Sequence, residues 1–330
     1  MVFRLWGPGM LMAYKIDQGS LIRLPPEASL ADAVWIDLVK PTREEERLVE
    51  AVIGAEVPTL EEMSEIEPSS RLYVEGSARF LTATMLCHTE LGTPKTTAVT
   101  FILRPERLVT VRYDDPRPFA LFCARAAKPR ALEGAGGDAV LNGLLDTVID
   151  RIADILEKVG DEIDSISRNV FDEATKDHAP SYKEDLRALG KKGDLVSKAR
   201  ESLVSFARIM LYLATEIEGV KLSKEARAII KTMQRDVESL AQHSDYLANK
   251  IQFVLDAVLG MVSIEQNNII KIFAVLSVVL MPPTLVASVY GMNFRLMPEL
   301  DWQYGYPLAI GLMVVAGALP YIYFKVKRWL

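Results

Sequence analysis

The short segment Gly291-Met292-Asn293, which we call the exit because it follows a long apolar stretch, offers the clearest chemistry in this chain. It directly follows the apolar residues 272–290, and a second apolar stretch covers residues 307–324. Backbone that leaves a helix at a membrane edge must hydrogen-bond to protein or to water. Glycine carbonyl and asparagine amide oxygens at such a place suit a polar ligand such as a hydrated metal ion. A plain helix C-cap is the alternative, because Gly and Asn are common there.

The two apolar stretches predict a transmembrane hairpin. They contain no charged side chain and are 19 and 18 residues long, close to the ~20 residues that cross a hydrocarbon core. Residues 325–330 carry three basic side chains, whereas the connection at residues 291–306 carries one arginine and two acids. Because basic residues favour the cytoplasmic side, we expect both termini in the cytosol and the connection outside.

A stripe of polar and small side chains runs along the first stretch. At 100° per residue, seven positions fall within about 80° of one another: Asn267, Ile270, Ala274, Ser277, Met281, Thr284 and Ser288. Polar side chains in a membrane span face protein or water rather than lipid. The stripe is therefore either the lining of a pore or a helix-packing face of small residues. Pro282-Pro283 is expected to bend or loosen the helix, so the angular positions beyond it are approximate.

The surrounding residues carry a family resemblance. The motifs are Pro282, Thr284, the Tyr-Gly-Met-Asn-Phe run at 290–294, Met-Pro-Glu-Leu at 297–300, Trp302, Gly-Tyr-Pro at 305–307 and the terminal Lys-Arg-Trp-Leu. Over residues 264–330 they resemble the C-terminal part of the CorA family of magnesium transporters. Arg295 departs from the pattern, because an acidic or neutral residue is expected after Phe294.

The resemblance implies a homopentamer whose first span lines the pore. It implies that Gly291, Met292 and Asn293 form the selectivity motif and that Asn267, Met281 and Thr284 face the pore. Mg²⁺ is then both the transported and the regulatory ion, and no other cofactor is expected. The position of Asp256 relative to the Gly-Met-Asn motif matches a regulatory acid of the family, although a solvated aspartate explains it equally well.

The chemistry of Mg²⁺ agrees with these assignments. The ion gives up its water reluctantly and prefers oxygen ligands, so a ring of Asn293 amides and Gly291 carbonyls can hold it through its water shell. Conduction requires binding weak enough for release. Thr284 adds a hydroxyl ring, and Met281 and Ile270 are candidates for apolar constrictions that close by dewetting.

Acidic residues outside the spans have two readings. Glu299 and Asp301 in the connection between the spans can concentrate cations, or they can simply be solvated.

Residues 1–270 carry a net charge of −9, since the whole chain has −6 and residues 271–330 have +3. This balance argues against a nucleic-acid partner and suits a cation.

The region before the spans is predicted to be helical from residue 138 onward. Helical segments are expected at about 139–174 and 180–217, and a third begins near Ser223. The third carries a heptad seam: Ala226, Ile230, Met233, Val237, Leu240, Ser244, Leu247, Ile251, Val254, Val258 and Met261. We expect the seam to pack on helices of its own chain, of other copies or of both, and to provide an assembly surface.

Residues 11–113 mix strand-like runs with helices, which predicts an α/β or α+β layer arrangement. Residues 33–39 read as a strand, and Thr42 with Glu45 as the capping box of a helix. Residues 96–103 and 107–113 read as a hairpin. The predicted divisions are an α/β domain (1–137), antiparallel helices (138–222), a stalk helix (223–271), a pore-lining span (272–290), a connection (291–306), a second span (307–324) and a basic tail (325–330).

Several function classes are excluded or remain open. Two cysteines and three scattered histidines give neither a disulfide framework nor a metalloenzyme spacing, and no nucleophile–base constellation predicts an enzyme. Residues 1–10 lack the apolar core of a signal peptide, and no phosphate-binding G-x-x-x-x-G-K-[ST] loop occurs. A magnesium uptake channel is the leading hypothesis. The alternatives are transport of Co²⁺, Ni²⁺ or Zn²⁺ by a protein of the same architecture, and a non-conducting membrane-anchored sensor.

Overall fold

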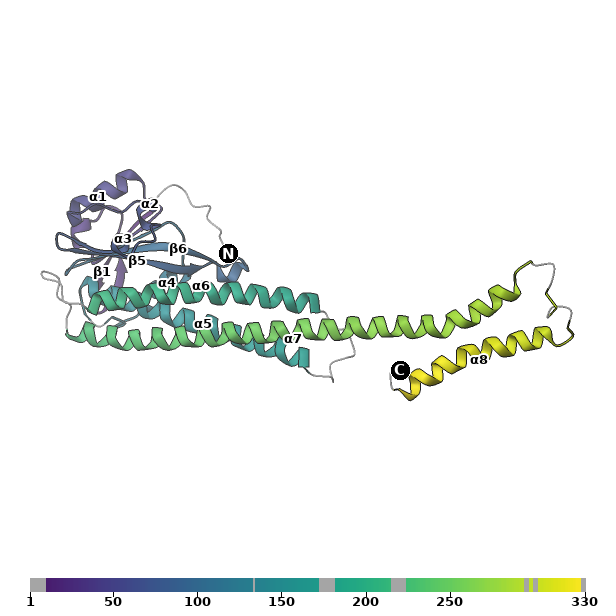
Figure 1. Cartoon of the computed structure of the whole chain (residues 1–330). Helices are drawn as coiled ribbons and strands as arrows, with labels where there is room; N and C mark the ends of the chain where they lie inside the picture. The colour runs from purple at the N-terminus through teal and green to yellow at the C-terminus, as the bar shows by residue number, and fades with distance from the viewer. Residues whose placement is uncertain are drawn as a thin grey trace. The chain divides into compact units, whose positions relative to one another are not determined.

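The computed structural model describes residues 10–132, 134–171, 182–214, 224–293, 297–298 and 302–327. The chain divides into two compact units, Met1–Val254 and Leu255–Leu330. Figure 1 labels their helices and some of their strands. The mixed α/β part, the long helix and the two apolar C-terminal helices expected from the sequence are all present, whereas the finer residue divisions stay a prediction.

The first unit is built on one seven-stranded sheet of order β2-β1-β3-β7-β6-β5-β4. Its strands are β1 (Met10–Asp17), β2 (Ser20–Arg23), β3 (Trp35–Val39), β4 (Leu72–Glu75), β5 (Ala78–Cys87), β6 (Lys95–Leu103) and β7 (Leu108–Arg112). Only β3 and β7 pair in parallel; the other neighbours are antiparallel. The predicted strand at 33–39 and the hairpin at 96–113 correspond to β3 and to the β6–β7 pair.

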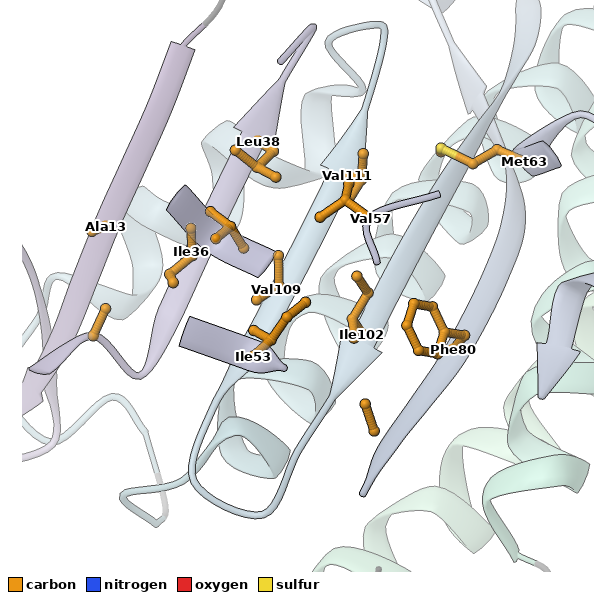
Figure 2. Packing of buried hydrophobic residues seen from close by; sticks show 13 residues of the cluster. Ala13, Ile36, Leu38, Ile53, Val57, Met63, Phe80, Ile102, Val109 and Val111 are labelled. Atoms are coloured by element: carbon orange, nitrogen blue, oxygen red, sulfur yellow. The ribbon is translucent and has the colours of Figure 1, made fainter. Parts of the chain in front are cut away.

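One face of the sheet is covered by helices α1 (Arg43–Ile53) and α2 (Leu60–Met63). Alternate strand residues such as Ile36, Leu38 and Val109 point into a buried cluster with Ile53 and Met63, and Figure 2 shows this packing. The capping box of α1 is confirmed. The Glu45 amide donates to the Thr42 hydroxyl over 3.3 Å, and the Thr42 amide donates to the Glu45 carboxylate over 2.8 Å.

The other face is covered by α4 (Arg117–Ala126), α5 (Gly137–Phe171) and α6 (Tyr182–Ala214). Trp35 packs its ring against those of Phe119 and Phe122 of α4. Gly137, the first residue of α5, lies so close to the β6–β7 turn that a Cβ would overlap the Arg107 carbonyl. That contact requires a glycine and brings α5 against the sheet.

Helix α7 (Lys224–Tyr290) uses the heptad seam within its own chain. Leu247 lies over Gly160 of α5, Ile251 lies over Gly193 of α6, and Lys250 forms an ion pair with Asp164 of α5. The buried seam residues of this unit are Ile230, Met233, Val237, Ser244, Leu247, Ile251 and Val254. The expectation that the seam provides an assembly surface is therefore wrong over this stretch, because α5 and α6 already cover it.

The second unit contains the rest of α7 and helix α8 (Gly305–Val326). Both helices are long and apolar enough to cross a membrane. The two prolines predicted to bend the first span, Pro282 and Pro283, lie inside α7, which continues through them. The helices contact each other where Gly317 of α8 faces Pro283. A Cβ at Gly317 would lie 3.2 Å from the proline ring and 3.5 Å from the Val279 carbonyl oxygen.

Candidate functional site

Helix α7 ends at Tyr290, and the next residues continue its hydrogen bonding. The Gly291 amide donates to the Ala287 carbonyl over 2.9 Å, and the Met292 amide donates to the Val289 carbonyl over 3.3 Å. Gly291 does not have the positive φ of a left-handed helix cap. A Cβ there would lie 3.1 Å from the Ala287 carbonyl oxygen. Gly291 therefore ends the helix without a left-handed conformation, and its role as a cation ligand stays a prediction.

The stripe predicted from the sequence is exposed in the single chain. All seven of its members have exposed side chains. Met281 reaches 69% exposure and Ile270 57%, values far from those of a core position. The residues of the exit, Gly291, Met292 and Asn293, are exposed as well.

The three hydroxyl groups of the stripe bond back to their own helix. Ser277 donates to the Phe273 carbonyl over 2.8 Å, Thr284 to the Leu280 carbonyl over 2.7 Å, and Ser288 to the Thr284 carbonyl over 2.8 Å. Each hydroxyl proton therefore has a partner without help from water. The oxygen keeps acceptor capacity, so this row of hydroxyls can accept hydrogen bonds from the water shell of a cation.

A different face of α7 meets α8. Val275 is 6% exposed, and Val279, Pro283 and Val286 are partly covered. These positions lie two residues from members of the stripe, which places the two faces about 160° apart on the helix. The small-residue packing face was the alternative to a pore lining. Within this chain, the packing surface for α8 is the valine and proline face, and the stripe stays bare.

A groove of about 470 Å³ follows the stripe. Its walls are Ser277, Leu280, Met281, Thr284, Leu285 and Ser288. Four of these six were predicted as lining residues. The groove alternates hydroxyl and apolar side chains along one helix, which suits a wall of a narrow aqueous passage and cannot by itself enclose one.

The remaining predicted residues lie apart from this groove. Asn267 and Ile270 are exposed on α7 before it, and Asp256 is exposed further toward the N-terminus of the same helix. Glu299 and Asp301, like Arg295, lie outside the described residues. The sequence reasoning missed the contact of Gly317 with Pro283. The signal was a small residue in the second span and a proline pair in the first.

Two helices long and apolar enough to cross a membrane, with Gly291-Met292-Asn293 after the first, are typical of a membrane protein with an ion route. The model of the CorA-like Mg²⁺ transporter protein family matches residues 31–328. Magnesium transport protein CorA of Salmonella typhimurium and that of Escherichia coli K12 are each 37% identical over 325 residues, covering 97% of this chain and all of theirs. The protein from Pasteurella multocida is 36% identical with the same coverage. The chain belongs to the CorA-like Mg²⁺ transporter family.

Solved structures agree on the fold. The complete CorA magnesium transporter from Methanocaldococcus jannaschii matches with a TM-score of 0.75 at 20% identity, over 99% of this chain and all of that one. Full-length CmaX matches with a TM-score of 0.69 at 12% identity and the same coverage. The family is one of transporters, so the prediction that this chain is not an enzyme is confirmed.

Proposed function

We propose that this protein carries Mg²⁺ into the cell along a channel-like route lined by α7. The observation that carries the proposal is the bare stripe, which faces away from α8 and leads to Gly291-Met292-Asn293. The relatives that match over nearly the whole chain are named magnesium transport proteins. A polar stripe on a membrane helix needs water or protein beside it, and a water-filled route satisfies that need.

Several copies must combine to make the route. One chain contributes two spanning helices, which cannot enclose a passage, so a closed ring of copies around an axis is required. We take that number to be five, as the family resemblance implies. In such a ring, each α7 turns its groove to the axis and α8 lies outside it toward lipid.

Selection takes place at the end of α7 in this proposal. Mg²⁺ keeps its water shell, and Gly291 carbonyls and Asn293 amides hold the ion through that shell. Ser277, Thr284 and Ser288 accept hydrogen bonds from the water shell along the groove. Met281 and Ile270 are the narrow apolar places that close by dewetting, and Asn267 makes a polar ring near the cytosolic end. Glu299 and Asp301 concentrate cations at the outer mouth.

The membrane potential supplies the driving force. It contributes ~2.3 kcal/mol per charge per 100 mV, hence ~4.6 kcal/mol for a divalent ion. Both termini lie on the cytoplasmic side of the inner membrane, so this drive is inward. Internal Mg²⁺ that binds the closed state more tightly than the open state limits entry, and Asp256 is our candidate ligand for that regulation.

The test is ion uptake into liposomes that contain the purified full-length protein. Mg²⁺, Co²⁺, Ni²⁺ and Zn²⁺ are compared side by side, with protein-free liposomes as the control. We expect Mg²⁺ to enter and to accelerate when the interior is made negative. Uptake of the other ions without Mg²⁺ would replace the magnesium proposal with transition-metal transport. Absence of uptake for all four would favour a non-conducting sensor.

A further inference from the structure

Three side chains with metal-binding chemistry meet at one edge of the sheet in the first unit, far along the chain from the stripe. Strands β5 and β7 both pair antiparallel with β6, so they run in the same direction and end at the same edge. Cys87 is the last residue of β5, His88 follows it, and Asp114 comes two residues after β7. Lys95, the first residue of β6, lies between the two strand ends as the register partner of Cys87.

The three groups are close enough to share an ion. Their ligand atoms, the Cys87 sulfur, a His88 ring nitrogen and an Asp114 carboxylate oxygen, lie within 4.8 Å of one another. His88 Nε2 is 2.8 Å from Asp114 Oδ1, and Cys87 Sγ donates to the Lys95 carbonyl over 3.3 Å. Zinc-class ions bind such ligands at about 2.0–2.3 Å, so closure around an ion needs shifts of only about an ångström.

The backbone at this edge is held in place. His88 has φ 58° and ψ 25°, a left-handed conformation that is uncommon outside glycine and clusters at ligand sites. Arg112 is buried and bonded to Asp37 over 2.9 Å, and its second nitrogen donates to the Asp114 carbonyl over 3.1 Å. The main chain at Asp114 is thereby fixed to the centre of the sheet.

All three groups line one solvent-accessible hollow. Its volume is about 540 Å³, and its wall also includes Glu90, Arg117 of α4 and Arg151 of α5. The side chains of His88 and Asp114 are 31% and 17% exposed, whereas Cys87 is 2% exposed. An ion bound to the three would therefore have its fourth coordination position toward the hollow, where a water molecule fits.

Positive and hydrogen-bonding groups already gather at the Asp114 carboxylate. The Asp115 amide donates to it over 2.9 Å, and His88 Nε2 lies 2.8 Å from the same oxygen. Lys95 forms an ion pair with the second oxygen of the carboxylate. An ion held by Asp114 would therefore take the place of the Lys95 ammonium.

We propose that Cys87, His88 and Asp114 bind one divalent transition-metal ion of the Zn²⁺ or Co²⁺ class, at a site separate from the Mg²⁺ route. Thiolate and imidazole donors suit these softer ions, whereas Mg²⁺ takes oxygen ligands. Binding forms a metal–sulfur bond, releases the thiol proton to solvent and displaces the Lys95 ammonium from Asp114. The ion joins the β5–β6 connection to the end of β7. Glu90 of that connection already bonds Arg151 of α5 over 3.1 Å.

The first experiment is a Co²⁺ titration of the reduced, metal-stripped full-length protein in detergent. We expect one ion per chain with a thiolate-to-Co²⁺ charge-transfer band in the near ultraviolet. Zn²⁺ removes the band, and a large excess of Mg²⁺ does not. Co²⁺ in a route built from oxygen ligands gives no such band, so the readout is independent of transport. A wild-type protein without the band overturns the proposal.

Variants assign the ligands. Cys87→Ser abolishes the band, whereas Cys123→Ser, which alters the other cysteine of the chain, keeps it. His88→Ala and Asp114→Asn each weaken Co²⁺ binding by at least about tenfold. A band that survives in Cys87→Ser, or is lost in Cys123→Ser, overturns the assignment.

Lys95→Met gives a test that misfolding cannot imitate. Lys95 is half exposed, with 51% of its side chain accessible, and its ammonium competes with the incoming ion for Asp114. Its removal should tighten Co²⁺ binding several-fold while circular dichroism shows an unchanged fold. Weaker or unchanged binding would contradict an ion held between these three side chains.

Discussion

Two parts of helix α7 differ in how their apolar side chains are covered. In residues 230–254, apolar side chains at heptad spacing are buried by α5 and α6, and the rest of the surface is mostly polar, with Tyr246 and Phe253 as exposed aromatic side chains. In residues 272–290, nearly every side chain is apolar, and most are exposed, as Phe273 at 65% and Leu285 at 65% illustrate. A helix that is apolar all round needs lipid or other helices as its surroundings. Among the residues that the structure describes, the first part packs on α5 and α6 of its own chain, and the second contacts α8 on one face.

This difference shows that a periodic sequence pattern predicts a packing partner for a helix but does not identify that partner. A heptad seam predicts that a helix has a partner on one side, and the seam of this chain leaves open whether that partner is the same chain, another copy or both. Leu247 and Ile251 meet Gly160 and Gly193 of the same chain. Assembly must then use other surfaces, and the bare second part of α7 is the one that the proposed ring uses.

The largest effect is expected at Asn293, in the segment that follows the apolar part of α7. Asn293→Ala should abolish Mg²⁺ uptake into liposomes and leave assembly intact, because in the proposed route Asn293 supplies amide oxygens and lies beyond Tyr290, where α7 ends. Uptake and sizing chromatography are measured together. Asn249→Ala, an exposed asparagine on the first part of the helix, is the matched control and should transport normally. Wild-type uptake in Asn293→Ala, or loss of its oligomer, would contradict the assignment.

A second substitution tests the buried seam of the first part. Leu247 is 1% exposed, so Leu247→Ala should lower the free energy of unfolding by about 2–5 kcal/mol through lost contacts and a cavity. Leu48→Ala in α1, where the leucine is 58% exposed, should change it by less than about 0.5 kcal/mol. Denaturant unfolding followed by circular dichroism compares the two. Equal effects would mean that α5 and α6 do not bury the seam in solution.

The elements of this fold could largely be predicted from local signals. The capping box at Thr42 and the apolar lengths of the two spans depend on residues close in sequence, and local chemistry decides them. Pairings between distant residues could not be predicted. Asp37 and Arg112 are 75 residues apart, and they meet because β3 and β7 are parallel neighbours.

The two candidate sites differ in the same way: one depends on the period of a single helix, and the other depends on strand order. The stripe of α7 could be predicted, because the period of one helix places Ser277, Thr284 and Ser288 on one face. The cluster of Cys87, His88 and Asp114 could not, because Asp114 lies far along the sequence from Cys87 and His88. It exists only because β5 and β7 end at one edge of the sheet, with β6 between them, and single-sequence patterns do not give strand order.

A third substitution tests the face of the apolar part of α7 that contacts α8. Gly317 lies against Pro283, so Gly317→Val should force the two helices apart and lower stability by about 1–3 kcal/mol. Gly311→Val in the same helix has open space around it and serves as the control. The thermal midpoint of the purified protein in detergent is the measurement. A Gly311→Val protein that loses as much stability would show that valine itself, rather than the contact, is at fault.

The smallest effect is expected at Asp256, which lies on α7 between its two parts. It is exposed, two residues after the buried Val254. If Mg²⁺ stabilises a closed state, it must bind that state more tightly than the open one, because equal affinity shifts nothing. Removing one negative charge from such a site should raise the Mg²⁺ concentration for half-maximal protection from protease by roughly fivefold.

Asp256→Ala is the cleaner variant for this test, since a lysine there would itself imitate the bound cation. Glu265→Ala, another exposed acid of the same helix, controls for the loss of a negative charge without a regulatory role. An unchanged protection curve together with wild-type uptake in Asp256→Ala would make the residue an ordinary solvated aspartate. The ligands that sense Mg²⁺ would then lie elsewhere, and the division of α7 into a packed part and a conducting part would hold without a sensor between them.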